Sequence, residues 1–574
     1  MVWQQEHRLA YEDFLEKYRI VVILFLGLFL MLAARLFHLQ VVKGKHFRTL
    51  SEQQRTQIIL ERAPRGIIYD RKGDIIVGNR TSFVALFYPF SQDFTPPRET
   101  LERVGKILPI KNVTAHITRC WRNGQVVRLA ENLSRAEMFQ LLEQRLVLPG
   151  ISVVKEARRE YRASEANSHL IGYLNEITRN ELDGMGPDGY KMGDWLGRRG
   201  LEKVYDPVLR GQDGGWQIEV DAMGRQTRLV RHIPSTIGSS LYTTIDARLQ
   251  EIAGEAMKKT PTGRGAVVGI DPRTGAIRVL VSSPGYDPNT SFSSEFRKYL
   301  VDKSLPLFNR AIQGLYPPGS TFKIITFLGA VNEHKIDLNQ TYHCNGAFTF
   351  GNKTFKCWEK KGHGTLSLVD ALAKSCNVYF YQVGLRVGPK ILESYARKFH
   401  IGEVTGAGLP SEKAGLVPSE EWKRKKLHEP WHQGDTINMA IGQGPLWTTP
   451  MQMAQMMSIV ASRGEIYQPY IVEKITTPNG ELVSQFTPKK KGEFKLPKES
   501  WDILIRALGE VVQNGTAHAC YFPDLKIGGK TGTAQNPHGD SHAWIVAFAP
   551  LENPELALAI VVENGGSGGA IAGP

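Results

Sequence analysis

An apolar run near the N-terminus constrains the folding of this chain more than any other feature. Residues IVVILFLGLFLMLAA (20–34) carry no charge, and LFHLQVV (36–42) continues the run after Arg35. A bilayer core is crossed by about 20 apolar residues in a helix, because a helix satisfies its own backbone polar groups. We therefore expect residues 20–42 to form a single transmembrane anchor.

A cleaved signal peptide or a buried helix would be the alternative to an anchor. The apolar part of a signal peptide is usually shorter and is followed by small residues, whereas Phe37, His38 and Gln40 follow here. An uncleaved anchor is therefore favoured. Basic residues flank the run on both sides: Arg8, Lys17 and Arg19 before it, and Lys43, Lys45 and Arg48 after it. The positive-inside rule consequently gives no orientation.

The length and charge of the chain narrow its class. A chain of 574 residues is too long for one core, so we expect two or three domains. The net charge of +14 fits a protein that works beside an anionic membrane or an anionic polymer. Lys and Arg are scattered and no nucleic-acid motif is present, so we expect no nucleic-acid partner.

The region from about 43 to 240 mixes strands with short amphipathic helices and has no repeats. Its segment APRGIIYDRKGDIIVGN (63–79) predicts a strand, a turn and a second strand. No residue spacing in this region indicates catalysis. We expect it to hold a later domain away from the membrane or to offer a docking surface.

From about residue 241 the pattern changes. LYTTIDARLQEIAGEAM (241–257) predicts a strand followed by a helix with Asp246 as its N-cap. GAVVGIDPRTGAIRVLVS (265–282) predicts a β-hairpin, and the segments 526–535, 542–550 and 556–565 predict strands at the other end. Strands at both ends with helices between them indicate one antiparallel sheet flanked by helices.

The stretch YPPGSTFKIITF (316–327) places Ser320 and Lys323 three residues apart after a Pro-Pro-Gly turn. The simplest interpretation is a helix start, with Ser320 as N-cap and Lys323 in solvent. The alternative is a nucleophile and its base on one helical face. A chain of this length contains about two Ser-x-x-Lys motifs by chance, so other segments must discriminate.

Two further clusters discriminate between these interpretations. Ser375-Cys376-Asn377 follows the helical pattern LSLVDALAK, and Lys530-Thr531-Gly532-Thr533 lies on the strand pattern KIGGKTGT. Separately, Ser375 would be a helix-end hydroxyl and Lys530 a solvated lysine. In this order, Ser-x-x-Lys, Ser-x-Asn and Lys-Thr-Gly resemble the active site of penicillin-binding proteins and serine β-lactamases.

The resemblance extends over nearly the whole chain. NRAIQGLYPPGSTFK (309–323) and GDTINMAIGQGPLWTTPMQMA (434–454) are similar to the transpeptidase domain of membrane-anchored class B penicillin-binding proteins. RGIIYDRKGDIIVGN and GLEKVYDPVLRG are similar to their N-terminal pedestal. The resemblance implies a multidomain fold: a cytoplasmic N-terminus (1–19), an anchor (20–42), an α+β pedestal of the dimerisation type (43–240) and an α/β transpeptidase domain (241–574).

The same resemblance implies a place in the cell. It puts the chain in the plasma (inner) membrane as a single-pass protein, with the catalytic domain on the outer, periplasmic side. Family members continue past the closing residues GGSGGAIAGP, so we expect a C-terminally truncated transpeptidase domain.

The resemblance also implies a role for each motif residue. The expected catalytic residues are Ser320, Lys323, Ser375 and Lys530, and the expected substrate-binding residues are Asn377, Thr531, Gly532 and Thr533. A free lysine has a pKa of about 10.4 and is a poor base, so burial and a second cation must lower the pKa of Lys323. Backbone N–H groups of Ser320 and Thr533 would form the oxyanion hole.

A second group of residues has metal-binding chemistry. Cys344, Cys357, His363 and Cys376 fall in one short window and could hold a structural zinc ion. Their spacing is too long for a finger motif, and one disulfide with a free thiol, or buried packing, is the alternative. Some members of the elongation-type penicillin-binding protein 2 family bind zinc beside the Ser-x-Asn loop, which favours zinc here. His343 is an alternative ligand, Asp370 is interpreted as a helix-surface charge, and Cys120 and Cys520 are isolated.

The function implied is peptidoglycan D,D-transpeptidation in cell elongation and rod-shape maintenance, through a Ser320 acyl-enzyme that releases D-Ala. The implied partners are stem peptides, β-lactam antibiotics, a SEDS-family glycosyltransferase and other membrane proteins of the elongation complex. A septal transpeptidase, a D,D-carboxypeptidase and an inert β-lactam-binding sensor or scaffold are alternatives. A β-lactamase would need a deacylating base, and no candidate is evident.

Overall fold

The computed structural model describes residues 2–45, 47, 56–87, 98–108, 127–148, 150–162, 164–184, 189–220 and 226–574. The chain divides into two compact units. The first comprises Met1–Ala63, Thr81–Ala157 and Gln212–Thr236, and the second comprises Pro64–Arg80, Arg158–Gly211 and Ile237–Pro574. Two segments of the region expected as pedestal, 64–80 and 158–211, therefore belong to the larger unit.

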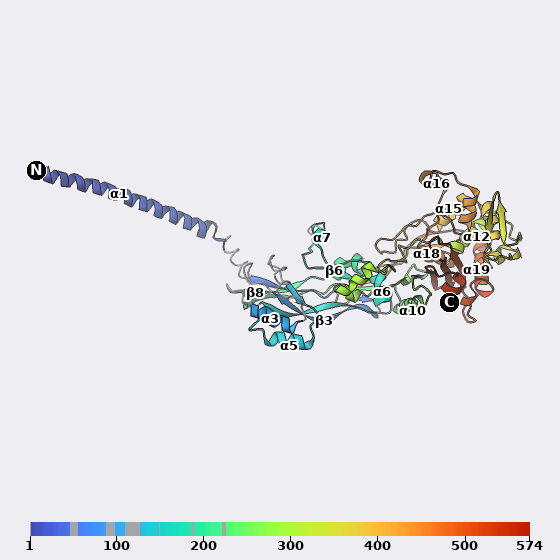
Figure 1. The fold of residues 1–574 in the computed structure, drawn as a ribbon, viewed down its shortest axis with the longest axis horizontal. Helices are drawn as coiled ribbons and strands as arrows, with labels where there is room; N and C mark the ends of the chain where they lie inside the picture. The colour runs from blue at the N-terminus through green and yellow to red at the C-terminus, as the bar shows by residue number, and fades with distance from the viewer. Residues whose placement is uncertain are drawn as a thin grey trace. The chain divides into compact units, whose positions relative to one another are not determined.

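The N-terminal segment is a single long helix, drawn in blue in Figure 1. Helix α1 (Val2–Phe37) continues into a π-helical turn, η1 (His38–Val42). Its stretch Ile20–Val42 has a mean hydropathy of 2.7, and none of it is buried in the structure. This helix matches the predicted anchor in place, length and composition.

The smaller unit contains an antiparallel three-stranded sheet, β1-β8-β9, made by Thr56–Glu61, Gly214–Val220 and Gln226–Ile233. Strand β3 (Ile75–Phe87) runs through the boundary between the units, and its final part pairs with β4 (Val127–Ala130). Helices α3 (Arg98–Ile107) and α5 (Arg135–Glu143) contribute to a small core with these strands.

The predicted strand-turn-strand at 63–79 is confirmed. Strand β2 (Ile68–Tyr69) pairs antiparallel with β3, and the Asp70 carboxylate between them accepts the backbone N–H groups of Lys72 and Asp74 at 2.7 and 2.8 Å. In the larger unit this hairpin continues a sheet through β10 (Ser240–Thr243), β18 (Val472–Thr476) and β19 (Leu482–Gln485).

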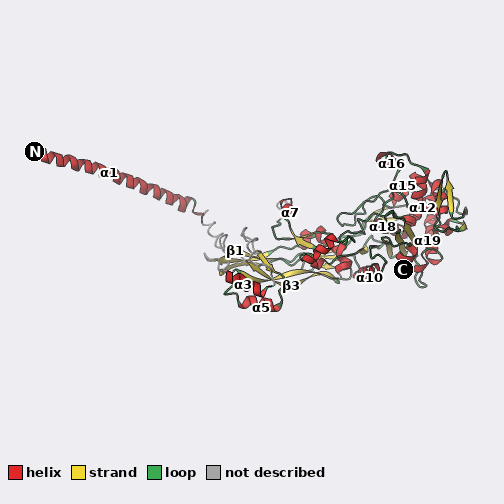
Figure 2. Cartoon of the chain, viewed as in Figure 1, coloured by secondary structure: helices red, strands yellow, loops and turns green. Residues whose placement is uncertain are grey.

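Further short elements follow within this part of the chain. They are β5 (Ile151–Tyr161), α6 (Ser164–Ile171), β6 (Leu174–Glu176), α7 (Arg179–Gly184), β7 (Trp195–Gly197), α8 (Gly200–Val204) and α9 (Asp206–Leu209). Both units contain helices and strands, as the colours of Figure 2 show.

The main sheet of the larger unit has five strands in the order β12-β11-β23-β22-β21, all antiparallel. The strands are β11 (Gly265–Ile270), β12 (Ile277–Ser283), β21 (Gly528–Ala534), β22 (His542–Ala549) and β23 (Leu556–Val562). The β11–β12 hairpin thus pairs through β11 with β23, one of the three C-terminal strands, with Gly265 opposite Val562. The predicted sheet of distant segments is confirmed.

Helices cover this sheet, as predicted. Helix α10 (Ala247–Lys258) contacts β12, the fully buried α18 (Pro450–Ala461) contacts β23, and α19 (Lys498–Gln513) contacts β21. The Asp246 side chain caps α10 by accepting the Leu249 N–H, which confirms its predicted role. Helices α12 (Lys323–Asn332) and α15 (Pro389–Lys398) are labelled together with α18 and α19 in the C-terminal part of Figure 1.

The remaining elements of the larger unit are mostly short. The helices are α11 (Arg297–Val301), α12 (Lys323–Asn332), α13 (Leu368–Ala373), α14 (Asn377–Val387), α15 (Pro389–Lys398), α16 (Glu420–Lys426) and α17 (Gln433–Ala440). The short helical turns are η2 (Pro288–Thr290), η3 (Ser294–Phe296), η4 (Gly319–Phe322), η5 (His518–Cys520) and η6 (Gly568–Ala572). The minor strands are β13 (Tyr342–Cys344), β14 (Ala347–Phe350), β15 (Lys353–Lys356), β16 (Gly364–Leu366), β17 (Glu465–Tyr467) and β20 (Lys490–Glu493).

Candidate active site

Ser320 lies on a helix start whose backbone is closely held. The 3₁₀ turn η4 leads directly into α12, so Ser320 and Lys323 are one 3₁₀ turn apart on the same side of the chain. Gly319 has φ +56°, and a Cβ at this position would lie 3.1 Å from the Thr533 carbonyl oxygen. A helix does begin here, as predicted, but the Ser320 side chain does not cap it.

The Lys323 amine is fully buried and points into the protein. Its Nζ donates to the Ser375 carbonyl oxygen at 2.8 Å and to Asn377 Oδ1 at 2.7 Å, and it lies 3.4 Å from Ser375 Oγ. Burial lowers the pKa of Lys323 to about 8, although the nearby thiols of Cys376 and Cys357 act in the opposite direction. Lys323 is therefore not the solvated lysine of the simplest interpretation.

A second buried amine approaches the same hydroxyl. Lys530 Nζ donates to Ser375 Oγ at 2.9 Å and to the carbonyl oxygen of Thr531 at 2.9 Å. Burial, together with the charge of Lys323, holds the pKa of Lys530 well below its usual range. The Ser375 hydroxyl thus lies between two buried amines, which suits the transfer of a proton between them.

Ser375 is presented by the loop between α13 and α14, not by a helix. It adopts φ +51°, a left-handed conformation that is uncommon for a residue with a side chain. The next residue, Cys376, is the N-cap of α14, and Asn377 is the first residue of that helix. The Ser-x-Asn motif therefore combines a strained loop residue with a helix start.

Strand β21 carries the Lys-Thr-Gly motif along the edge of the main sheet. Within the described chain it pairs on one side only, with β22. Thr531 Oγ1 lies 2.6 Å from Thr516 Oγ1, while Thr533 is exposed. A Cβ on Gly532 would come within 3.0 Å of the Pro318 carbonyl oxygen, so glycine lets the strand lie against the Ser320 turn.

The four predicted metal ligands come together next to this loop. Cys344, Cys357, His363 and Cys376 place their ligand atoms within 4.8 Å of one another. Pairing of β13 with β16 brings Cys344 beside His363, whose backbone N–H donates to the Cys344 carbonyl oxygen at 3.0 Å. Cys357 directly follows the β14–β15 hairpin, and Cys376 comes from the Ser-x-Asn loop.

The donor set fits a tetrahedral zinc ion. His363 Nδ1 lies 3.7 Å from Cys344 Sγ and 3.6 Å from Cys357 Sγ. Zn–S and Zn–N bonds of 2.3 and 2.0–2.1 Å at tetrahedral angles give an S···N separation of about 3.6 Å. The second His363 nitrogen, Nε2, is buried and has no hydrogen-bond partner among the residues that the structure describes.

The other residues considered for metal binding lie elsewhere. His343 is exposed, and its Nδ1 lies 3.1 Å from Thr365 Oγ1. The Asp370 carboxylate accepts a hydrogen bond from Ser367 Oγ at 2.6 Å within the first turn of α13. The described cysteines, including Cys520, are all free thiols, and Cys120 lies outside the described residues.

Sequence reasoning missed several residues that shape the site. Trp358 Nε1 donates to the Ser375 carbonyl oxygen at 3.2 Å while its side chain stays 55% exposed beside the loop. Trp544 Nε1 donates to the Pro317 carbonyl oxygen at 3.1 Å. No local pattern marks either tryptophan, because each acts through a contact with a distant segment.

Comparison with known proteins covers both units. Residues 265–574 match the penicillin-binding protein transpeptidase domain, and residues 60–243 match the penicillin-binding protein dimerisation domain. The chain is 32% identical to the peptidoglycan D,D-transpeptidase MrdA of Escherichia coli strain K12 over 589 residues, which cover 96% of this chain and 92% of that protein.

Solved structures resemble the chain over similar lengths. The complex between the penicillin-binding protein PBP2 and MreC from Helicobacter pylori has a chain with a TM-score of 0.75 and 28% identity, covering 90% of this chain and 97% of that one. A second structure, on the structural coordination of polymerization and crosslinking by a peptidoglycan synthase complex, has a TM-score of 0.73 and 28% identity. The match covers 97% of this chain and 96% of that one. The chain belongs to the penicillin-binding protein transpeptidase family.

Proposed function

We propose that this protein is a peptidoglycan D,D-transpeptidase with Ser320 as its nucleophile. The observation that carries the proposal is the pair of buried amines, Lys323 and Lys530, on either side of the Ser375 hydroxyl and next to the Ser320 turn. The match to the transpeptidase domain and to MrdA supports the same activity.

Acylation needs a neutral base beside the serine. A pKa of about 8 raises the neutral fraction of Lys323 at pH 7 from about 0.03% for a free lysine to about 10%. Ser320 Oγ attacks the carbonyl carbon of the penultimate D-Ala, and its proton passes to Lys323. The C–N bond to the terminal D-Ala breaks, and the leaving nitrogen takes a proton through Ser375. The amine of a second stem peptide then attacks the ester carbonyl, the bond to Ser320 Oγ breaks, and the proton that the amine loses returns to Ser320 through Lys323.

The substrate fits the free side of β21. An extended peptide pairs with an exposed strand edge through backbone hydrogen bonds, and β21 has such an edge within the described chain. Thr531 and Thr533 would hold the terminal carboxylate, and Asn377 would bond a substrate amide. The backbone N–H groups of Ser320 and Thr533 would stabilise the oxyanion.

Intact-mass measurement with a fluorescent penicillin tests the nucleophile. We expect one adduct per chain, mapped by peptide analysis to Ser320, and no adduct on Ser320→Ala. An adduct that persists on folded Ser320→Ala would reject the assignment. Released D-Ala and crosslinked dimers, measured with a pentapeptide substrate, separate transfer from simple hydrolysis.

We also propose a structural Zn²⁺ held by Cys344, Cys357, His363 and Cys376. The support is the convergence of their ligand atoms within 4.8 Å and the 3.6–3.7 Å separation of His363 Nδ1 from two of the sulfur atoms. The ion would pin the loop that carries Ser375, since Cys376 is its neighbour. Metal analysis should give one zinc per chain, lost in Cys344→Ser but retained in Cys520→Ser, whose thiol lies outside the cluster. A chelator should also lower the melting temperature of the wild type.

For the cellular role, we propose work in an elongation complex with a membrane-embedded glycosyltransferase of the SEDS family. The relatives include a PBP2 solved with MreC and a peptidoglycan synthase complex that couples polymerization and crosslinking. The apolar helix α1 would anchor the chain, with the catalytic unit on the outer face of the membrane. Complementation of rod shape in cells depleted of MrdA tests the role, and reporter fusions after residue 42 test the orientation.

A further inference from the structure

The four residues that precede the nucleophile are held by contacts to distant segments. Tyr316 exchanges two backbone hydrogen bonds with Thr448, both 2.9 Å long, and the Pro317 carbonyl oxygen accepts from Trp544. The stretch 316–319 is Tyr-Pro-Pro-Gly, so Tyr316 has the only polar side chain within it. Other segments hydrogen-bond to the backbone of this stretch, and the Tyr316 phenol is the one group through which the stretch itself can make a side-chain hydrogen bond.

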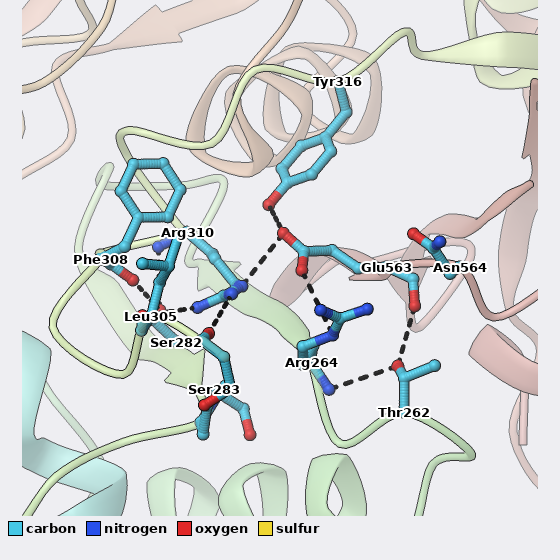
Figure 3. A network of polar contacts seen from close by, with 12 residues as sticks. Thr262, Arg264, Ser282, Ser283, Leu305, Phe308, Arg310, Tyr316, Glu563 and Asn564 are labelled. Atoms are coloured by element: carbon cyan, nitrogen blue, oxygen red, sulfur yellow. Dashed lines mark hydrogen bonds and ion pairs between the residues drawn. The ribbon is translucent and has the colours of Figure 1, made fainter. Parts of the chain in front are cut away.

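The phenol of Tyr316 reaches the end of the central strand. Its Oη donates to Glu563 Oε1 at 2.8 Å, as Figure 3 shows, and Glu563 directly follows β23. The ring packs edge-on against His542 and Trp544 of β22, with centroid distances of 5.3 and 6.0 Å. The approach to Ser320 is thus tied to the neighbouring strands β22 and β23 of the main sheet.

The acceptor of this bond is itself held in place. The Arg310 Nε lies 3.0 Å from Glu563 Oε1, and Arg264 Nε lies 3.8 Å from Oε2. The Arg310 side chain is 3% exposed, and its other nitrogens donate to the carbonyl oxygens of Leu305 and Ser304 at 3.1 and 2.7 Å. The contact with Glu563 is an ion pair without hydrogen-bond alignment, because this Nε–H has no hydrogen-bond partner in the described part of the chain. The carboxylate is therefore charge-compensated and fixed (Figure 3).

We propose that Tyr316 and Glu563 are positioning residues for acylation. The bond between the Tyr316 phenol and the Glu563 carboxylate sets the position of the Ser320 turn relative to Lys323 and Ser375. Neither residue contacts the reacting atoms, and both act through the backbone of 316–319. A displacement of about 1 Å at a nucleophile can lower a reaction rate by about 10²-fold. Loss of the Tyr316 hydroxyl, which holds the turn before Ser320, is therefore sufficient for a measurable effect on acylation. This inference rests on the proposed function of Ser320.

Single-turnover acylation by a fluorescent penicillin tests the proposal on the full chain. Tyr316→Phe removes one oxygen, and we expect the acylation rate constant to fall about 10- to 100-fold while penicillin affinity before acylation changes less than about threefold. Glu563→Gln keeps an acceptor oxygen for the phenol, so its acylation rate constant should fall less than that of Glu563→Ala. The double variant Tyr316→Phe/Glu563→Gln should be no slower than Tyr316→Phe, since both act through one bond.

A second pair in which a buried tyrosine donates to a glutamate provides the control, although Glu333 is exposed. Tyr395 Oη donates to Glu333 Oε1 at 2.7 Å at the opposite end of α12 from Lys323. Tyr395→Phe should lower the melting temperature about as much as Tyr316→Phe and leave the acylation rate constant unchanged. A folded Tyr316→Phe that acylates at the wild-type rate constant overturns the positioning role. A wild type that is never labelled at Ser320 overturns the proposed function instead.

Discussion

Two clusters of buried charge in the larger unit are built in opposite ways. Glu202 is fully buried, and the guanidinium groups of Arg65 and Arg159 approach its carboxylate to 2.8 and 2.7 Å. Lys323 and Lys530 are equally buried, but neither has a carboxylate partner among the described residues. The first cluster compensates its charges, and the second leaves two like charges together.

The pKa shifts follow from this difference. Burial alone would lower the pKa of Arg65, but the charges of Glu202 and Asp206 outweigh it and raise the value. Burial lowers the pKa of Lys323 to about 8 without such compensation. Paired charges stay ionised, whereas unpaired buried amines give up their protons more readily and can act as bases. In these two clusters, the paired buried charges have a structural role, and the unpaired buried amines have a chemical one.

Removing the unpaired amine should give the largest effect. Lys323→Met keeps the volume of the side chain but deletes the base, and we expect the acylation rate constant to fall about 10³-fold. The free energy of unfolding should stay level or rise, because an uncompensated buried amine is lost. Penicillin labelling and thermal melting measure the two effects. Lys423, a buried lysine paired with Asp435 at 2.7 Å, supplies the control: Lys423→Met should lower stability and leave acylation intact.

Breaking the paired cluster should do the reverse. Glu202→Gln leaves two buried guanidinium groups short of a counter-charge, and we expect a loss of about 3–5 kcal/mol in the free energy of unfolding. The acylation rate constant of the folded fraction should change less than about threefold. Denaturant unfolding provides the measurement. The control is Glu421→Gln, which breaks the exposed ion pair with Lys425 and should leave the free energy of unfolding almost unchanged. Equal stability of both variants would contradict a structural role for the cluster.

A smaller change at the helix start tests how closely the nucleophile is held. Gly319→Ala adds a Cβ 3.1 Å from the Thr533 carbonyl oxygen at φ +56°, and we expect about tenfold slower acylation. Gly351→Ala has nearly the same backbone cost at φ +60° but meets nothing within 4 Å. Both variants should lose about 1–2 kcal/mol of stability, and only Gly319→Ala should acylate slowly. If Gly319→Ala and Gly351→Ala both acylate slowly, the approach to the Thr533 carbonyl oxygen is not the cause.

The pH dependence should be the mildest effect and should differ between the clusters. The acylation rate constant should rise about fivefold from pH 7 to 8 and level off above, as Lys323 loses its proton. Because its folded pKa lies below the unfolded value, this lysine makes stability rise with pH between about 8 and 10.5. The pKa of Glu202 is lowered overall, although burial alone would raise it, so its contribution is present above about pH 4.5 and is lost on acidification. Stopped-flow labelling and unfolding across pH give both profiles, and a flat rate profile would exclude Lys323 as the base.

Local patterns predicted a large part of the architecture. The apolar run predicted α1, Asp246 predicted the start of α10, and Asp-Pro-Arg-Thr-Gly predicted the β11–β12 hairpin. Each of these elements depends on residues close together in the sequence, through their hydrophobicity, helix capping or turn chemistry. The 3₁₀ turn at Gly319–Phe322 was not predicted, because neighbouring segments impose it through Gly442 and Thr533.

The catalytic residues of the candidate site were predictable only where they form motifs. Ser320 and Lys323, Ser375 and Asn377, and the Lys530 strand are recognisable by spacing and order. Trp358, Tyr316 and Glu563 are single residues without a motif, and their contacts join segments up to 247 residues apart. A contact at this separation leaves no periodic signal in the chain.

The amino-acid sequence by itself determined which side chains are available: an anchor-length apolar helix, a serine with two lysines, and three thiols with one imidazole. Only the tertiary structure decided what these groups can do. It placed Lys530 Nζ 2.9 Å from the hydroxyl of Ser375, 155 residues away, and buried both lysines without a counter-charge from the described residues. A pKa depends on solvent exclusion and on neighbouring charge, and both arise when distant segments pack together.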